Sequence, residues 1–188
     1  MKCNTLFLDR DGVINRKIND GYVTKIEEFE FLPNVLEALA ILAKEFEYIF
    51  IVTNQQGIGK HVFTLDDLQK IHDFMLHKIT ENGGRIDKIY VAPHLEAENH
   101  CTRKPNIGMA LQAKEDYPAV NFSNSIMAGD SLSDMQFGKN AGMTRVFFTN
   151  GIPVNQNIAD YTFYDLFEFA NTISQKQYFR NRKIPVVF

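Results

Sequence analysis

Short apolar runs alternate with stretches of helical periodicity along most of this chain, and this alternation limits the possible folds more than any other feature. Five runs rich in Phe, Ile and Val each end in polar or glycine-containing sequence: NTLFLD, YIFIVTN, RIDKIYVAP, NSIMAGD and TRVFFTNG. Their length and composition predict buried strands. Strands that alternate with helices are joined by right-handed crossovers, so we expect an α/β fold with a doubly wound, mainly parallel sheet covered on both faces.

The segments between these runs have apolar residues three and four positions apart. This spacing predicts amphipathic helices from Val35 to Phe46 and from Leu68 to Ile79. The second helix also has a start signal, because Thr64 and Asp67 form a Thr-x-x-Asp capping pattern. IGMALQAK, SDMQFGKNAG and YDLFEFANTI predict the remaining helices. The tail KQYFRNRKIPVVF, residues 176–188, has no pattern that we can interpret.

Length and composition predict a single domain over residues 1–188. The chain has 188 residues, 45% of them hydrophobic, which is enough for one core but too few for two ordinary domains. A net charge of -3 gives no general attraction to nucleic acid or to an anionic membrane. No apolar run approaches the roughly 20 residues of a membrane-spanning helix, and the first residues do not resemble a signal peptide. Two cysteines cannot supply a disulfide framework. We therefore expect a monomer in the cytoplasm that binds neither nucleic acid nor membrane.

Polar side chains follow four of the predicted strands at the points where those strands end. They are Asp9 and Asp11 after the first strand, Thr53 and Asn54 after the second, Arg103 and Lys104 in the loop after the third, and Asp130 and Asp134 after the fourth. Open parallel sheets bind ligands beyond the carboxyl ends of their strands. The sequence therefore predicts that these side chains share one crevice.

The residue types in that crevice predict phosphoryl chemistry. Clustered aspartates without sulfur ligands favour magnesium, and a cation relieves the repulsion between Asp9 and Asp11. One carboxylate can attack phosphorus, while another protonates the leaving oxygen and then activates water. Lys104 would neutralise charge on the transferred group, and Thr53 would bind its oxygens. Gly12, without a side chain, lets the backbone approach the phosphate.

Four motifs in this order resemble those of the haloacid dehalogenase superfamily phosphatases: LDRDGVIN, the Thr of IVTNQQG, the Lys of RKP, and AGDSLSD. They span most of residues 5–150. More narrowly, DRDGVIN, GYV, FEFLPNV, TNQQGIG and RKP are similar to the D-glycero-D-manno-heptose 1,7-bisphosphate 7-phosphatases and to the related histidinol-phosphate phosphatases. The resemblance implies a Rossmann-like fold and a magnesium-dependent phosphomonoesterase that acts through an aspartyl phosphate. The intervals after the first motif and the third strand are too short for a cap domain, so we expect an open site.

The resemblance also implies roles for individual residues. Asp9 would be the nucleophile and Asp11 the proton donor, while Asp9, the backbone carbonyl of Asp11, and Asp130 would hold magnesium. Thr53 and Lys104 would stabilise the phosphoryl group. Substrate contacts carry over to Asp20, Gly21, Tyr22, Asn54, Gln55, Gln56 and Arg103, with Ser131 where a lysine often occurs in the heptose enzymes. Two roles stay open for Asp134: it fixes Lys104 or a metal-bound water, or it caps the following helix.

The implied substrate is heptose 1,7-bisphosphate, from which the 7-phosphate would be removed, and the alternative substrate is histidinol phosphate. GYVTKIEEFEFLPNV resembles the heptose enzymes over a longer run, whereas APHLEAENHCTRKP has the loop length of the histidinol enzymes. The guanidinium of Arg103 can bind a second phosphate with two hydrogen bonds. Histidinol phosphate is instead a cation that needs further carboxylates, for which Asp20, Glu96 and Glu98 are candidates.

The relatives often carry a structural zinc loop before the Arg-Lys-Pro. Here Ala92 and Thr102 stand where two of its cysteines occur, which leaves His94, His100 and Cys101. A closed structural zinc site needs four ligands, so we expect a loop without zinc.

Three further interpretations complete the prediction. GIGK, residues 57–60, is expected to be a plain turn and not a phosphate-binding loop, because it lacks the upstream glycine spacing and has His61 where Ser or Thr should bind magnesium. We place His72 and His77 on the solvent side of their helix. A receiver-type phosphoacceptor module is a second candidate function, but its motif order differs, because a receiver carries the phosphoacceptor at its third strand.

Overall fold

The computed structural model describes residues 5–153 and 157–175. One six-stranded sheet runs through it in the order β3-β2-β1-β4-β5-β6, and every neighbouring pair is parallel. The strands are β1 (Thr5–Leu8), β2 (Tyr48–Asn54), β3 (Lys88–Ala92), β4 (Ser125–Gly129), β5 (Thr144–Phe148) and β6 (Tyr161–Phe163). The predicted parallel sheet is confirmed. Only the three-residue edge strand β6 had not been predicted.

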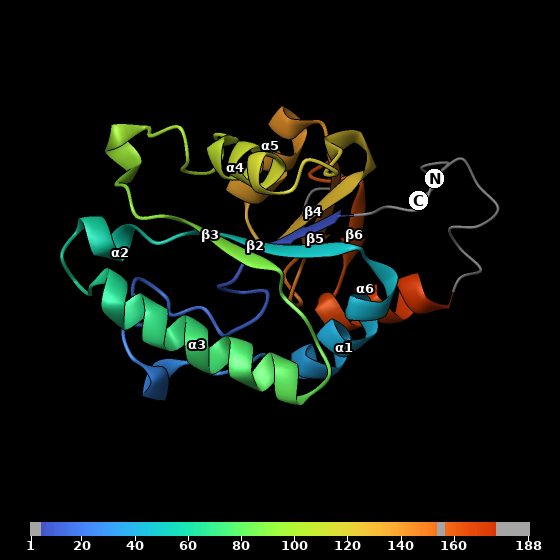
Figure 1. The fold of residues 1–188 in the computed structure, drawn as a ribbon, viewed down its shortest axis with the longest axis horizontal. Coiled ribbons are helices and arrows are strands. Elements are labelled where there is room, and N and C mark those ends of the chain that lie inside the picture. Colours follow the sequence, from blue (N-terminus) through green and yellow to red (C-terminus); the bar gives the residue numbers. More distant parts are fainter. Residues whose placement is uncertain (1–4, 154–156, 176–188) are drawn as a thin grey trace.

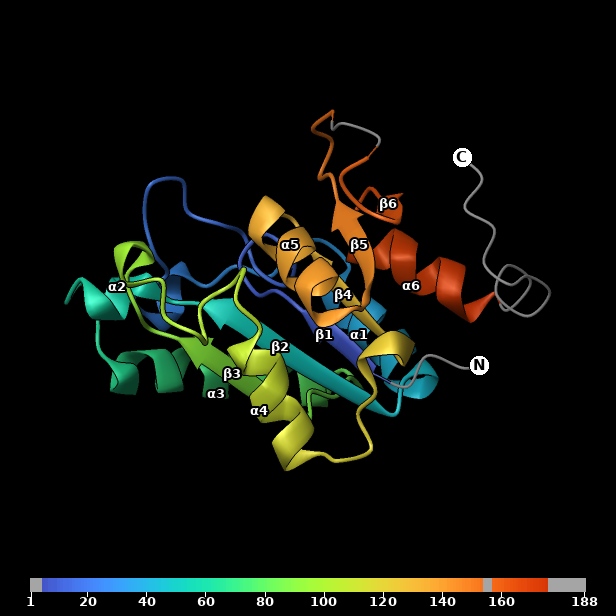
Figure 2. The same ribbon diagram turned by 90° about the horizontal axis from the view of Figure 1, so that it is seen from above.

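Helices cover both faces of this sheet (Figure 1; Figure 2). One layer contains α4 (Gly108–Asp116) and α5 (Leu132–Ala141), and the opposite layer contains α1 (Val35–Glu45), α3 (Leu65–Glu81) and α6 (Leu166–Ser174). The predicted capping box is present, since Thr64 Oγ1 accepts from Asp67 N while Asp67 Oδ2 accepts from Thr64 N. Every helix that the sequence predicts is present among these five.

The central strand β1 shows why the strands are apolar on both sides. Leu6 and Leu8 pack into the core beneath α1, α3 and α6, whereas Phe7 packs with Phe50 and Phe137 on the other side of the sheet. All of these side chains are fully buried. Successive strand residues point to opposite faces, so a strand with helices on both sides needs a continuous apolar run.

Short helical segments lie in the loops: η1 (Ile26–Glu28), α2 (Gln56–Gly59), η2 (Glu96–Glu98) and η3 (Phe122–Asn124). The chain between β1 and β2 contains only loops, η1 and α1, and the chain between β3 and β4 contains only loops, η2, α4 and η3. Neither interval forms a cap domain. The interpretation of GIGK as a plain turn is wrong in part, because α2 forms a helical turn directly after β2. The tail 176–188 lies outside the described residues.

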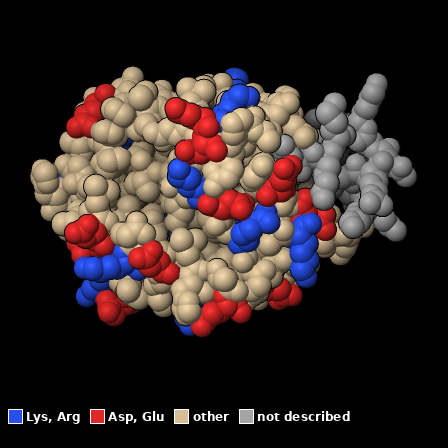
Figure 3. All heavy atoms as spheres, in the orientation of Figure 1, with Lys and Arg blue, Asp and Glu red and all other residues tan. Residues whose placement is uncertain are grey.

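On the face shown in Figure 3, acidic and basic side chains are mixed. None of the helices in residues 5–153 and 157–175 has the length and apolar character required to cross a membrane.

Candidate active site

A cleft of about 480 Å³ lies beyond the carboxyl ends of the central strands. The switch in strand order between β1 and β4 falls beside it, the place where open α/β sheets bind ligands. Its lining includes every residue predicted to act in catalysis or to contact substrate: Asp9, Asp11, Asp20, Gly21, Tyr22, Thr53, Asn54, Gln55, Gln56, Arg103, Lys104 and Ser131. The fold thus brings together residues that are up to 122 positions apart in the chain, from Asp9 to Ser131.

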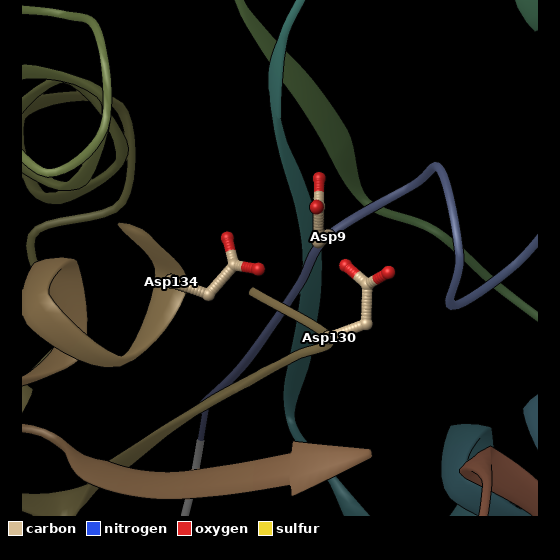
Figure 4. A group of neighbouring side chains, drawn as sticks. All are labelled: Asp9, Asp130 and Asp134. Carbon is tan, nitrogen blue, oxygen red and sulfur yellow. The ribbon is translucent and has the colours of Figure 1, made fainter. Parts of the chain in front are cut away.

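Three carboxylates lie close together next to this cleft, and one of them, Asp9, lines it (Figure 4). Asp9, Asp130 and Asp134 each offer an oxygen within 4.8 Å of the others. Burial and then the charge of Asp134 raise the pKa of Asp9 to about 7, against the effect of Lys104. Burial likewise raises the pKa of Asp130, whose Oδ1 is buried without a hydrogen-bond partner among the described residues. An unpartnered oxygen among crowded carboxylates fits a hard divalent cation such as magnesium.

Asp134 combines the two roles between which the sequence could not decide. Its Oδ1 accepts from Lys104 Nζ at 2.5 Å, and its Oδ2 accepts from the backbone N–H of Ser131 at 3.1 Å and from Ser131 Oγ at 2.6 Å. It therefore fixes the lysine and caps α5 together with Ser131. Both of its oxygens thus already accept hydrogen bonds from residues of the site.

Lys104 is buried between two carboxylates. Its Nζ lies 2.9 Å from Asp9 Oδ1 and 2.5 Å from Asp134 Oδ1. Burial by itself lowers the pKa of Lys104, but Asp134 and Asp9 more than offset that effect, so the pKa is raised and the ammonium stays charged. Asn54 fixes the backbone of the same residue, since its side chain accepts from Lys104 N and donates to Lys104 O.

Asp11 is not part of this cluster and accepts hydrogen bonds on both oxygens. Arg10 Nη2 donates to Oδ1 and Oδ2 at 2.9 Å each, Asn15 Nδ2 donates to Oδ1 at 2.9 Å, and Gln55 Nε2 donates to Oδ2 at 2.8 Å. Burial alone raises the pKa of Asp11, but Arg10 and the other hydrogen bonds lower it below its usual range. Gln55 also donates to Thr53 Oγ1 and so links the two residues.

The placement of His72 on the solvent side of its helix is wrong. The side chain is buried, and its Nε2 lies 3.1 Å from Arg10 Nη1. The apolar residues Leu68, Ile71, Met75 and Ile79 share its buried face, and position 72 fits their spacing of three and four. The spacing therefore indicates a buried position for His72, whereas its polar side chain favours an exposed one. His77, by contrast, is exposed as predicted.

Sequence reasoning gave no role to several other residues at the site. Lys17, Lys60 and Ser133 line the cleft. Lys17 Nζ lies 3.5 Å from Asp130 Oδ2, and Lys60 Nζ lies 5.6 Å from the centroid of the Tyr22 ring. Asn150 Nδ2 donates to Gly12 O at 3.0 Å and so ties the loop after β5 to the first motif. These contacts join segments that are far apart in the chain, so no local sequence pattern predicts them.

The loop that lacks two cysteines contains two stacked imidazoles. The ring centroids of His94 and His100 are 3.4 Å apart. His94 Nδ1 lies 3.3 Å from a Glu98 oxygen, and His100 Nδ1 lies 2.8 Å from Thr102 Oγ1. Arg103, which lines the cleft, donates from Nη1 to His94 O at 3.3 Å and so connects this loop to the site.

Comparison with known proteins agrees with this geometry. The family model for polynucleotide kinase 3 phosphatase matches residues 5–179. The chain is 44% identical over 150 residues to the D-glycero-alpha-D-manno-heptose-1,7-bisphosphate 7-phosphatase of Campylobacter jejuni, covering 80% of this chain and 84% of the relative. It is 34% identical over 183 residues to the D-glycero-beta-D-manno-heptose-1,7-bisphosphate 7-phosphatase of Escherichia coli K12, covering 92% of this chain and 94% of that protein.

The fold is also similar to a solved structure. The D,D-heptose 1,7-bisphosphate phosphatase from B. bronchiseptica, complexed with magnesium and phosphate, has a TM-score of 0.82 and 28% identity, covering 92% of this chain and 98% of that one. The chain described here therefore belongs to the haloacid dehalogenase phosphatases, in the polynucleotide kinase 3 phosphatase family and together with the heptose-1,7-bisphosphate 7-phosphatases.

Proposed function

We propose that this phosphatase removes the 7-phosphate of D-glycero-D-manno-heptose 1,7-bisphosphate through an aspartyl-phosphate intermediate on Asp9. The ion pair between Asp9 and Lys104 on the floor of the cleft is the observation that carries this proposal. It supplies a nucleophile and, 2.9 Å away, a buried cation that neutralises charge on the transferred phosphoryl group. The names of the relatives supply the substrate class.

The reaction has two steps. A carboxylate oxygen of Asp9 attacks phosphorus while the bond from phosphorus to the sugar oxygen breaks, and Asp11 gives that oxygen a proton. Because, against the effect of burial, Arg10 lowers the pKa of Asp11 in the structure, Asp11 has to take up this proton when the negatively charged substrate binds. Asp11, now a carboxylate, then takes a proton from water, which attacks the aspartyl phosphate and breaks the bond from phosphorus to Asp9. Inorganic phosphate leaves, and both aspartates return to their starting protonation states.

Magnesium, when bound, neutralises charge on the phosphoryl oxygens and orients the phosphate. We assign it to Asp9, Asp130 and the backbone carbonyl of Asp11. Thr53 binds a phosphoryl oxygen, and Lys104 stays in place because Asp134 and Asn54 hold it. Asn54 acts on the substrate through Lys104, to which it is hydrogen-bonded. Gln55 acts in the same way through its hydrogen bond to Asp11.

The charges of the cleft favour a bisphosphate over a cationic substrate. Lys17, Lys60 and Arg103 line it, and we assign Arg103 to the second phosphate. Of the carboxylates considered for the amine of histidinol phosphate, Asp20 lines the cleft, whereas Glu96 and Glu98 lie outside its lining. A receiver module does not fit, because its strand order is 2-1-3-4-5, whereas here β1 lies between β2 and β4.

A comparison of kcat/KM tests this function. The substrates are both anomers of heptose 1,7-bisphosphate, histidinol phosphate and simple hexose phosphates, each measured with wild type and Arg103→Ala. We expect a heptose bisphosphate to be preferred by at least tenfold, with Arg103→Ala lowering its kcat/KM by about tenfold or more. Histidinol phosphate as the better substrate, or no effect of Arg103→Ala, would overturn the substrate assignment and leave the phosphatase in place.

We further propose that residues 1–188 form one catalytic domain, and that the protein is a monomer in the cytoplasm. Composition and size support these proposals. Analytical ultracentrifugation and cell fractionation test them.

A further inference from the structure

A chain of buried contacts runs from helix α3 to Asp11. His72, on α3, is 4% exposed, and its Nε2 lies 3.1 Å from Nη1 of Arg10. Arg10 is 0% exposed, and its Nη2 donates to both carboxylate oxygens of Asp11 at 2.9 Å. A residue 62 positions away in sequence thus reaches the first motif through one guanidinium.

The chemistry of the contact fixes the state of His72. A guanidinium has only donors and keeps its charge, so the nitrogen that faces it must be the unprotonated acceptor of a neutral imidazole. Burial and the charge of Arg10 lower the pKa of His72 to about 3, against the effect of Asp11. The side chain is therefore neutral at neutral pH, with its proton on Nδ1. An apolar side chain at position 72 would leave a buried donor of Arg10 unpaired.

In the part of the chain that the structure describes, the guanidinium forms hydrogen bonds to two side chains, those of His72 and Asp11. Its Nε is buried and has no hydrogen-bond partner among the described residues. Nη1 is held by His72 and Nη2 by Asp11, so loss of the imidazole would let the guanidinium turn about its remaining contact. Asn15 and Gln55 also donate to Asp11, but both are neutral amides. The charged contact that aims the Asp11 carboxylate is therefore itself held from α3.

We propose that His72 and Arg10 are positioning residues for Asp11, a role that rests on the proposed acid–base function of Asp11. His72 lies outside the cleft lining and acts only through Arg10. The pair holds the carboxyl at one end of the first motif, while the backbone N–H of Arg10 donates to Asp9 Oδ1 at 2.8 Å at the other end. One residue thus fixes the nucleophile by its backbone and the acid–base by its side chain.

The dependence of the rate on the leaving group tests this proposal. The full-length protein with saturating magnesium is assayed on 4-nitrophenyl phosphate, whose phenolate leaves without a proton, and on phenyl phosphate, whose leaving oxygen needs one. We expect His72→Leu to lower kcat/KM for phenyl phosphate by about tenfold to a hundredfold, with a change of about threefold or less for 4-nitrophenyl phosphate. The ratio of the two values cancels any difference in the fraction of folded enzyme.

Three further variants make the result specific. His72→Gln keeps an acceptor for Arg10 and should restore most of the wild-type ratio. His77→Leu removes an exposed histidine from the same helix and should leave the ratio unchanged. If His72→Leu is too unstable to purify, His72→Met removes the acceptor with a more adaptable side chain. Equal losses on both substrates, or a ratio that does not change, would overturn the proposal and leave the pair a merely structural role.

Asp11→Asn, measured beside these variants, tests the acid–base role of Asp11 separately from the positioning role of His72 and Arg10. It should show the same dependence on the leaving group, and a larger one. If it does not, the acid–base role of Asp11 fails and the positioning role fails with it. If Asp11→Asn shows the dependence and His72→Leu does not, only the positioning role fails.

Discussion

Gly12 leaves room for the carboxylate of Asp130, because a β-carbon on Gly12 would overlap Oδ2 of that side chain. Gly12 also has φ +90°, a conformation that side chains rarely adopt. The glycine of the first motif is thus required by an aspartate from the fourth.

Gly12→Ala should therefore weaken magnesium binding by at least about tenfold, since Asp130 has to move. Gly142→Ala is the matched control: Gly142 has φ +74°, and a β-carbon there would meet nothing within 4 Å. Both variants should lose about 1 kcal/mol of stability from the backbone conformation. Magnesium titrations followed by calorimetry and by activity measure the difference, and an unchanged magnesium affinity in Gly12→Ala would contradict the assignment of Asp130.

Asp9→Asn should fold normally but lose turnover by several orders of magnitude, because an amide is a poor nucleophile. With a substrate carrying radioactive phosphate, acid quenching should trap label on the wild-type protein and none on the variant. Asp165→Asn, at the N-cap of α6, is the control for the same substitution outside the cleft. Activity of Asp9→Asn within about tenfold of wild type would refute the covalent mechanism.

Asp134→Ala should lower stability by about 3 kcal/mol or more, because it removes one of two carboxylates that hold the buried Lys104. It should also lower kcat at least about tenfold, since the ammonium is no longer fixed beside Asp9. Thr64→Ala breaks a capping box on α3 that is exposed, and should lower stability by about 1 kcal/mol without affecting kcat. Urea unfolding and steady-state assays compare the two. Equal, small effects would reduce Asp134 to a helix cap.

The contribution of His72 to the stability of the protein should decrease as the pH falls below neutral. Its folded pKa of about 3 is below the ordinary value of 6.5, so the unfolded chain binds an extra proton between these values. The charged groups Arg10 and Asp11 face it, and burial is the largest cause. The contribution of His72 to the free energy of unfolding therefore decreases as pH falls through about 6.5, by up to about 1.4 kcal/mol per pH unit. Asp9, whose raised pKa is about 7, contributes with the opposite sign, so the effect of His72 is read from the difference between wild type and variant.

Urea denaturation between about pH 5.5 and 7.5 measures this dependence. His72→Gln should reduce the slope by close to one proton, whereas His77→Gln, at an exposed position, should keep it. If the slope of His72→Gln equals that of wild type, the imidazole is not held neutral by its surroundings.

Purified protein should contain substoichiometric zinc that chelators remove easily. Nδ1 of His94 faces Glu98 and Nδ1 of His100 contacts Thr102, and the cysteine beside them is exposed. Three candidate ligands do not complete a closed structural site. Elemental analysis before and after dialysis against a chelator is the measurement, and one tightly held zinc per chain would show that this loop binds metal in spite of its missing cysteines.

The sequence by itself determined the sheet and the place of the chemistry. Apolar runs that end in Asp9, Thr53 and Asp130 predict parallel strands whose carboxyl ends meet, and the polar residues after them line one cleft or lie next to it. This was predictable because strand direction and burial follow from local patterns of two and of three to four residues.

Only the tertiary structure decided which partner each polar side chain takes. Asp134 bonds Lys104 across 30 positions, and His72 meets Arg10 across 62. Neither contact has a local signature, because the strands and helices that bring these residues together meet only when the sheet is assembled. A hydrogen bond forms only if its donor and acceptor are placed to within a few tenths of an ångström, and the periodicity of a sequence does not specify positions so finely. The sequence therefore located the charged groups, and packing between distant elements chose their pairs.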